Sequence, residues 1–238
     1  MGVITVGVEG VNDFHNDACA EPNRTYNIYR PAVFAQTMQN YGLPVLFQWF
    51  DDNAWETDFR DPSFGNGGDS HNWSDNVNFC YYADHGGNNN TNMSIAFSFS
   101  HNQCQGNSST WRFGSTNLKW LVFDCCNFVS GTNNNQLASW FQSANGVHIL
   151  MGFIGESVDT DGYAADFASD ILNGSTVAGA WVNDAYSWWD NDFPIAIAFG
   201  ADGNESQSRL NNETLEYLFF DQISVGSLSA KWQVNWEI

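Results

Sequence analysis

The sequence predicts an α/β protein built around a mostly parallel sheet, because short apolar runs alternate with segments of helical periodicity. Of the 238 residues, 43% are hydrophobic and 16% are aromatic, so the chain can bury a sizeable core, which argues against overall disorder. A chain of this length fits one large domain. We expect an α/β domain over residues 1–205 and a C-terminal β extension, residues 206–238, packed on the same domain.

The predicted strands are short runs rich in aromatic and β-branched residues, bounded by Gly, Asn and Asp. They cover residues 3–9, 44–50, 77–83, 118–124, 147–155 and 193–200. Because nearly all residues in these runs are apolar, we expect the strands to be buried on both faces, as in a parallel sheet covered by helices.

The predicted helices show apolar residues at helical spacing, and they cover residues 27–41, 134–144, 162–172 and 175–187. Pro31 suits the first turn of the first helix, and Gly42 is a stop signal after it. Asn173-Gly174 separates the last two helices, and Ser175 is the expected N-cap of the second.

The remaining segments are polar or alternate between apolar and polar residues. Residues 51–76 are expected to form a loop rich in Asp, Gly and Asn, and residues 93–113 to form a hairpin excursion. Residues 214–238 alternate in the manner of an antiparallel β appendage.

Two reactive side chains follow two of the predicted strands. His85 comes directly after the strand over 77–83, and Cys126 follows the strand over 118–124. Sites in open α/β sheets form beyond the carboxyl ends of the strands, so an imidazole and a thiol would meet there if these two strands are neighbours. A thiol needs a base beside it to act as a nucleophile, which indicates covalent catalysis.

The residues around this pair resemble the caspase-like cysteine peptidases, which include caspases, metacaspases, legumains, gingipains and clostripain. Their pattern runs roughly Y-Y-S-G-H-G, then an apolar block ending in D-A-C, with Ser-Gly soon after. This chain has Tyr81-Tyr82-Ala83-Asp84-His85-Gly86-Gly87, and later Phe123-Asp124-Cys125-Cys126 with Ser130-Gly131. The resemblance spans roughly residues 3–200, and its specific parts are these two blocks.

The resemblance implies a caspase-like sheet and a cysteine endopeptidase that uses a His–Cys dyad. It places Cys126 as the nucleophile, His85 as its acid–base partner and Gly86 as a backbone donor to the oxyanion. Asp84 replaces the small residue that usually precedes the His, and Asp17 resembles an acidic pocket residue of metacaspases. Carboxylates there would bind substrate and favour cleavage after Arg or Lys.

Composition limits the partners. The net charge is −20 with only seven Lys and Arg, which argues against nucleic acid and anionic membranes, because such binding needs clustered cations. We therefore expect no nucleic-acid and no membrane partner, whereas the resemblance implies a peptide or protein substrate. Sequons such as those at Asn23 and Asn204 favour a secreted protein over a cytoplasmic one.

The five cysteines leave at least one thiol unpaired, and a Cys19–Cys104 bridge remains open. No cofactor or metal is expected. A zinc site that uses His101 and Cys104, completed by Cys125 or Cys126, is the competing chemistry, but it lacks a second paired motif.

Two other function classes stay open. One is a caspase-like domain without proteolysis that acts in binding or assembly. The other is a secreted glycan-binding module, to which aromatic pairs such as Trp188-Trp189 and Trp232 with Trp236 would contribute. The other histidines, His15, His71 and His148, are expected at the surface or in packing roles.

Overall fold

The structure is a computed structural model that describes residues 3–14, 21–88, 93–96, 104–129, 140–187, 192–216 and 228–234. In these residues, seven strands form a central sheet in the order β10-β9-β8-β7-β3-β1-β2. The strands are β1 (Val6–Gly10), β2 (Val45–Phe50), β3 (Phe79–Ala83), β7 (Trp120–Asp124), β8 (Ile149–Phe153), β9 (Pro194–Gly200) and β10 (Ser229–Val234).

The sheet is mostly parallel, as predicted. Strands β2, β1, β3, β7 and β8 run parallel to their neighbours, whereas β9 is antiparallel to both β8 and β10. The crossovers between the parallel strands are long enough to hold helices, which is the connection that parallel pairing requires. The predicted strand positions agree with this sheet, and the expected C-terminal appendage contributes its edge strand β10.

In the described part of the chain, four α-helices flank the sheet: α1 (Tyr29–Tyr41), α3 (Ala164–Leu172), α4 (Val177–Asp184) and α5 (Gly203–Asn212). Helix α1 stops at Gly42, whose φ of 104° is left-handed and therefore suits glycine. Helix α4 is capped by Thr176, whose hydroxyl accepts the N–H of Gly179 at 3.2 Å. The expected cap, Ser175, is therefore wrong by one residue.

Helix α5 was not predicted, and the expected domain boundary between residues 205 and 206 falls inside it. Its sequence is polar, so the apolar periodicity that signals a helix is weak. A cap signal was nevertheless available, because the Asp202 carboxylate accepts the N–H groups of Asn204 and Glu205 at 2.8 and 2.9 Å. Glu205, three residues after Asp202, completes the pattern typical of a helix start.

The predicted helix over 134–144 is wrong for the residues that the structure describes. Residues 134–139 lie outside the described part; Trp140 is 3-10 helical, residues 141–143 form a turn, and Ala144 makes an isolated bridge to Phe113. The predicted hairpin over 93–113 corresponds to β5 (Met93–Ala96) and β6 (Gln105–Asn107), which pair antiparallel, while residues 97–103 lie outside. A third strand, β4 (Gly86–Asn88), joins them in a small separate sheet.

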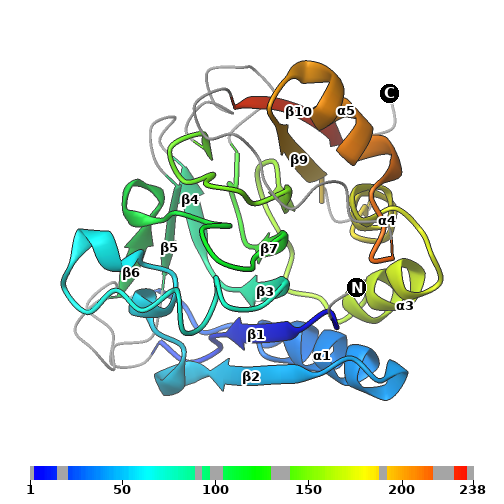
Figure 1. Cartoon of the computed structure of the whole chain (residues 1–238). Helices are drawn as coiled ribbons and strands as arrows, with labels where there is room; N and C mark the ends of the chain where they lie inside the picture. The colour runs from blue at the N-terminus through cyan, green and yellow to red at the C-terminus, as the bar shows by residue number, and fades with distance from the viewer. Residues whose placement is uncertain are drawn as a thin grey trace.

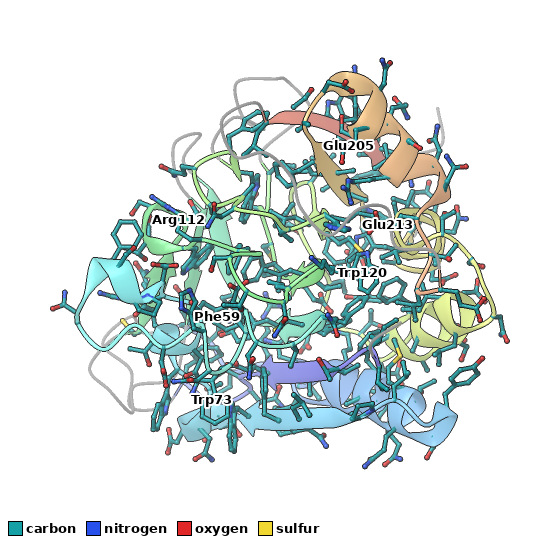
Figure 2. The ribbon with its side chains drawn as sticks, in the orientation of Figure 1. Phe59, Trp73, Arg112, Trp120, Glu205 and Glu213 are labelled. Carbon is teal, nitrogen blue, oxygen red and sulfur yellow. The ribbon has the colours of Figure 1, made fainter. Side chains whose placement is uncertain are left out.

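Two apolar layers cover the two faces of the central sheet. One layer contains α1, α3, α4 and Leu210 of α5, with Trp120 buried at its centre. The other is formed by irregular chain, including Phe59 in the segment over 51–76, which folds into the short 3-10 helices η1 (Asp51–Asn53), η2 (Glu56–Asp58) and η3 (Pro62–Phe64). Figure 1 shows the helices to the right of the sheet and the small sheet to its left, and Figure 2 shows side chains filling the space between. No helix in the described part of the chain is both long and apolar enough to cross a membrane.

One carboxylate is buried in the irregular layer without compensation. Glu9 of β1 is 0% exposed, and neither of its oxygens has a hydrogen-bond partner among the described residues. Burial raises the pKa of Glu9 well above its usual range, and the nearby Asp58 raises it further. The folded protein therefore favours the protonated, neutral form of Glu9.

This burial predicts a loss of stability as pH rises. A group whose folded pKa is raised binds more protons in the folded state, so its stabilising contribution is present at low pH and is lost above the unfolded value of about 4.3. In wild type, this effect lowers the free energy of unfolding by up to about 1.4 kcal/mol for each pH unit, and Glu9→Gln should abolish that contribution to the slope. Urea unfolding between about pH 5 and pH 8 measures it. The exposed Glu216→Gln variant is the control, and an unchanged slope in Glu9→Gln would refute the assignment.

Candidate active site at the carboxyl edge of the sheet

The sheet brings the two reactive side chains to neighbouring strand ends. Strands β3 and β7 are adjacent and parallel, with Ala83 paired to Asp124 at their carboxyl ends. His85 and Cys126 each lie two residues beyond this last pair, so they emerge at the same edge. The backbone turns sharply after Cys126, because Asn127 has a φ of 53°, a left-handed conformation that Asn tolerates better than most residues.

The hydrogen bonds of His85 fix its tautomer. Its Nε2 lies 2.8 Å from the carbonyl oxygen of Pro22, and its Nδ1 lies 3.2 Å from a terminal guanidinium nitrogen of Arg24. Because a guanidinium only donates, Nδ1 must accept, and Nε2 therefore carries the proton that is donated to Pro22. Burial lowers the pKa of His85, and the Arg24 charge lowers it further while the Pro22 carbonyl opposes this. The ring is thus a neutral base at neutral pH.

The sulfur of Cys126 has donors around it. The same Arg24 nitrogen lies 3.8 Å from Sγ, and the backbone N–H of Ser157 donates to Sγ at 3.4 Å. The carbonyl oxygen of Ser157 lies 3.6 Å away, where it can accept a thiol proton. The two contacts through one Arg24 nitrogen limit the separation of His85 Nδ1 and Cys126 Sγ to about 7 Å, within the loose spacing of a dyad without substrate.

Cys125 and Cys126 lie in different environments. Cys125 is 0% exposed, and burial raises the pKa of its thiol well above the usual range. Cys126 is half-buried, so its sulfur is the more accessible of the two. The two adjacent thiols therefore differ in accessibility, which the sequence alone does not show.

Arg24 is the residue that sequence reasoning missed. The backbone N–H of Arg24 donates to Asn12 at 2.9 Å. The next two backbone N–H groups, of Thr25 and Tyr26, donate to the Asp159 carboxylate at 2.7 and 2.8 Å. These contacts tie the loop after β1 to the loop after β8 and hold the guanidinium over the site. The only available signal was that Arg is scarce in this chain.

Asp84, directly before His85, has its carboxylate inside the protein. Its side chain is buried, with 3% exposure, and its carboxylate accepts the Tyr82 hydroxyl and the backbone N–H of His85, the latter at 2.5 Å. Burial raises its pKa well above the usual range. Both carboxylate oxygens thus have partners within the protein, and the substrate-binding role of Asp84 stays a prediction. Asp17, the other predicted substrate carboxylate, lies outside the described residues.

The buried carboxylate of Asp124 is the centre of a polar cluster beneath the candidate site. Hydroxyl groups of Tyr81, Tyr163 and Ser157 donate to it at 2.7, 2.7 and 3.1 Å. The Arg30 guanidinium of α1 completes the set with an ion pair of 2.8 Å. Because Ser157 also donates its N–H to the Cys126 sulfur, Asp124 fixes one wall of the thiol environment.

The remaining residues singled out in the sequence are Gly86, the candidate zinc ligands and His148. Gly86 is the first residue of β4, directly after His85. Cys104 is disulfide-bonded and so cannot be a zinc ligand, and Cys19 and His101 lie outside the described residues. Where the structure describes the chain, it contains no cluster of three or more His, Cys, Asp or Glu side chains suited to a metal. His148 is buried against Glu213, with an Nδ1–Oε1 distance of 2.8 Å, as a packing histidine.

These features define a class: an α/β protein whose parallel sheet carries an imidazole, a guanidinium and a thiol at its carboxyl edge. Residues 8–238 match the family model described as Domain of unknown function (DUF6345), and the chain belongs to that family. A search of curated proteins finds no match to this chain.

The Asp124 cluster predicts a large stability effect. Asp124→Ala leaves the Arg30 guanidinium buried without its carboxylate, so we expect a loss of about 3–5 kcal/mol in the free energy of unfolding. Chemical denaturation measures this loss. The exposed Asp161→Ala variant, in the loop after β8, should change stability by less than about 0.5 kcal/mol. Equal effects of the two substitutions would contradict the proposed anchoring.

The thiol environments predict selective alkylation. Brief iodoacetamide treatment at neutral pH should label Cys126 and leave the buried Cys125 and Cys80 unlabelled, as peptide mass spectrometry would show. Arg24→Gln removes the cation beside the sulfur and should slow labelling severalfold. Predominant labelling of Cys125 would contradict the placement, and an unchanged rate in Arg24→Gln would exclude an electrostatic role for Arg24.

Proposed function

We propose that this protein is a caspase-like cysteine endopeptidase in which Cys126 is the nucleophile and His85 is the acid–base partner. The observation that supports it best is the shared environment of the two side chains. One Arg24 nitrogen contacts both His85 Nδ1 and Cys126 Sγ at the ends of adjacent parallel strands. An uncharged ring nitrogen, whose lone pair accepts from Arg24, then lies on the side of the thiol, where a general base belongs.

The proposed reaction follows from these positions. Once a peptide enters, His85 Nδ1 takes the proton of the Cys126 thiol, and the thiolate attacks the carbonyl carbon of the scissile bond. The C–N bond then breaks while the imidazolium returns its proton to the leaving amine, which leaves a thioester on Cys126. Water, deprotonated by the same imidazole, hydrolyses the thioester and regenerates the thiol.

The oxyanion of the tetrahedral intermediate needs backbone donors. We assign this role to the N–H groups of Gly86 and Cys126, which come from the two strand ends that carry the dyad. An added Cβ at the neighbouring Gly87 would meet no heavy atom within 4 Å, so there is open space beside this segment. A substrate backbone can approach glycines more closely than other residues.

Arg24 sets a condition on this mechanism. Its guanidinium contacts both reactive groups, so it can stabilise negative charge that develops on the sulfur, but it also stands where a proton would pass between them. We propose that the Arg24 side chain withdraws when a substrate backbone enters. This movement brings the sulfur and the imidazole into direct reach.

Substrate preference rests on the charge of the whole protein. With a net charge of −20, the protein should attract cationic peptides, so cleavage after Arg or Lys is the first specificity to test. The Asp84 carboxylate has its partners inside the protein, so we do not rest this preference on it. A preference that rests on the overall charge should appear as faster association with basic peptides, and it should weaken as salt is added.

The same geometry favours one alternative, a caspase-like domain without proteolysis that acts in binding or assembly. If Arg24 stays between His85 and Cys126, the three side chains form a polar clamp that ties the loop after β1 to the sheet. In that case, His85 and Cys126 have a structural role and catalyse no reaction.

A fluorogenic peptide panel separates the two functions. Peptides with Arg, Lys, Ala or Asp before the cleaved bond are incubated with wild type and with Cys126→Ala. A peptidase should cleave at least one wild-type substrate, most rapidly a basic one at low salt, while Cys126→Ala should lose at least about 10³-fold in rate. Cys125→Ala is the matched control and should keep its activity.

Turnover that is absent in both wild type and Arg24→Gln, or unchanged in both cysteine variants, would reject the peptidase. Turnover by Cys126→Ala that disappears in Cys125→Ala would reassign the nucleophile. A wild type that is inert while Arg24→Gln cleaves would show that Arg24 restrains the dyad.

A further inference from the structure

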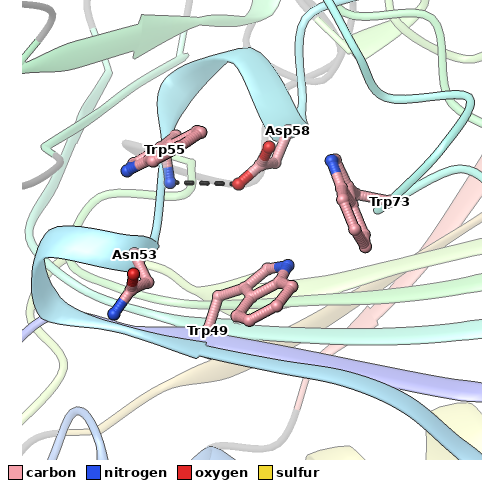
Figure 3. Close-up of a pocket in the computed structure, with 5 residues that line it drawn as sticks. All are labelled: Trp49, Asn53, Trp55, Asp58 and Trp73. Atoms are coloured by element: carbon pink, nitrogen blue, oxygen red, sulfur yellow. Dashed lines mark hydrogen bonds between the residues drawn. The ribbon is translucent and has the colours of Figure 1, made fainter. Parts of the chain in front are cut away.

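Three tryptophans surround a pocket at the end of the edge strand β2. The pocket has a volume of about 220 Å³ and is lined by Trp49, Asn53, Trp55, Asp58 and Trp73, which we call the tryptophan pocket. Figure 3 shows the Asp58 carboxylate above the Trp49 indole, with Trp73 on one side and Trp55 and Asn53 on the other. The lining comes from the end of β2 and from the irregular segment over 51–76.

The aromatic rings meet at right angles. The centroids of Trp49 and Trp73 are 5.4 Å apart with an interplanar angle of 82°, so the rings form two walls of a corner. Their surroundings hold them in place: Trp73 Nε1 donates to Asp69 at 3.0 Å, and Trp55 Nε1 donates to the Asp52 carbonyl at 2.6 Å. A corner of fixed indole faces differs from the flat platform on which a sugar ring stacks.

The pocket is acidic. Asp58 is 2% exposed, and one of its oxygens accepts the backbone N–H of Trp55 at 3.1 Å. The acidic groups Glu56 and Asp69 lie close enough to raise the pKa of Asp58, which burial, the largest cause, brings to about 7. Arg60 is ion-paired with Glu56 at 2.8 Å, and no cation is among the residues that line the pocket.

A second buried carboxyl group, that of Glu9, lies next to this pocket. Glu9 is the β1 partner of Trp49 in the sheet, so the two side chains leave the sheet on the same face. Both Glu9 oxygens lack a hydrogen-bond partner among the described residues, and Glu9 and Asp58 act on each other electrostatically. Because Glu9 stays protonated, the charge that a ligand can neutralise is that of Asp58, and no cationic side chain lines the pocket to neutralise it first.

We propose that the tryptophan pocket binds a quaternary ammonium group, with the cation over the faces of Trp49 and Trp73 and beside the Asp58 carboxylate. Indole faces attract cations through their quadrupole, and the attraction strengthens in a desolvated site. A quaternary ammonium has no N–H, so it loses little by leaving water for an aromatic corner. The carboxylate supplies the charge complement that a neutral ligand cannot use.

Choline tests the proposal against an uncharged molecule of the same shape, 3,3-dimethyl-1-butanol. Isothermal titration and tryptophan fluorescence should show saturable choline binding to the full chain, at least tenfold tighter than that of the alcohol. Asp58→Asn keeps the shape and should weaken choline binding about tenfold, and Trp73→Leu should weaken it as much. Asp161→Asn and Cys126→Ala should bind as wild type does, which separates this site from the dyad.

The pH dependence provides a second readout. The groups that act on Asp58 are Glu9 of β1, Glu56 of η2 with its partner Arg60, and Asp69 of the following loop. Ionisation of Asp58 favours the cation, so wild-type affinity for choline should rise severalfold between about pH 6 and pH 8, and Asp58→Asn should flatten this rise.

Three results would overturn the proposal. They are equal affinity for choline and its uncharged analogue, tighter binding of an oligosaccharide such as cellotetraose than of choline, or unchanged choline affinity in both folded variants. Circular dichroism establishes that the variants are folded. Binding to phosphatidylcholine vesicles in addition to choline would identify a lipid headgroup as the source of the cation, and binding to choline alone would identify a free small molecule.

Discussion

The buried ion pair between Arg30 and Asp124 supports the whole carboxyl edge of the sheet. Two charges taken out of water are stabilising only when the remaining polar atoms are also satisfied. Asp124 meets this condition with the hydroxyl groups of Tyr81, Tyr163 and Ser157. The pair joins helix α1 to the end of β7, so the helix layer and the strand that carries the cysteines share one anchor.

The Arg30 guanidinium extends this anchor into the loop after β8. It donates to the carbonyl oxygens of Val158 and Thr160 at 2.9 and 3.3 Å, which hold the backbone on both sides of Asp159. The Asp159 carboxylate in turn binds the loop that carries Arg24. Polar contacts therefore connect the buried core with the guanidinium between His85 and Cys126. They pass from the Arg30–Asp124 pair to the backbone around Asp159, and from the Asp159 carboxylate to the loop that carries Arg24.

Few basic residues serve a very acidic chain, and their placement is selective. Of the seven Lys and Arg, Arg30 and Arg24 lie at the carboxyl edge, and Arg209 is buried between Glu205 and Glu213. Glu9 and Asp58 have no such partner among the described residues, and burial raises the pKa of both. The protein thus places its cations where structure requires them and leaves an acidic, aromatic pocket at β2.

The sequence by itself determined the α/β class, the places of the main strands along the chain and the positions of His85 and Cys126 after strand ends. Apolar runs and turn residues are local signals, so they can be found without knowing which strands pair. Tertiary structure decided what those signals could not carry. Arg24, Asp159 and Ser157 reach the site from loops distant in sequence, and no periodicity marks them. Asp84 was predicted to line a pocket, and only the structure shows that its carboxylate bonds inside the protein, since a side chain's direction depends on the neighbours that packing supplies.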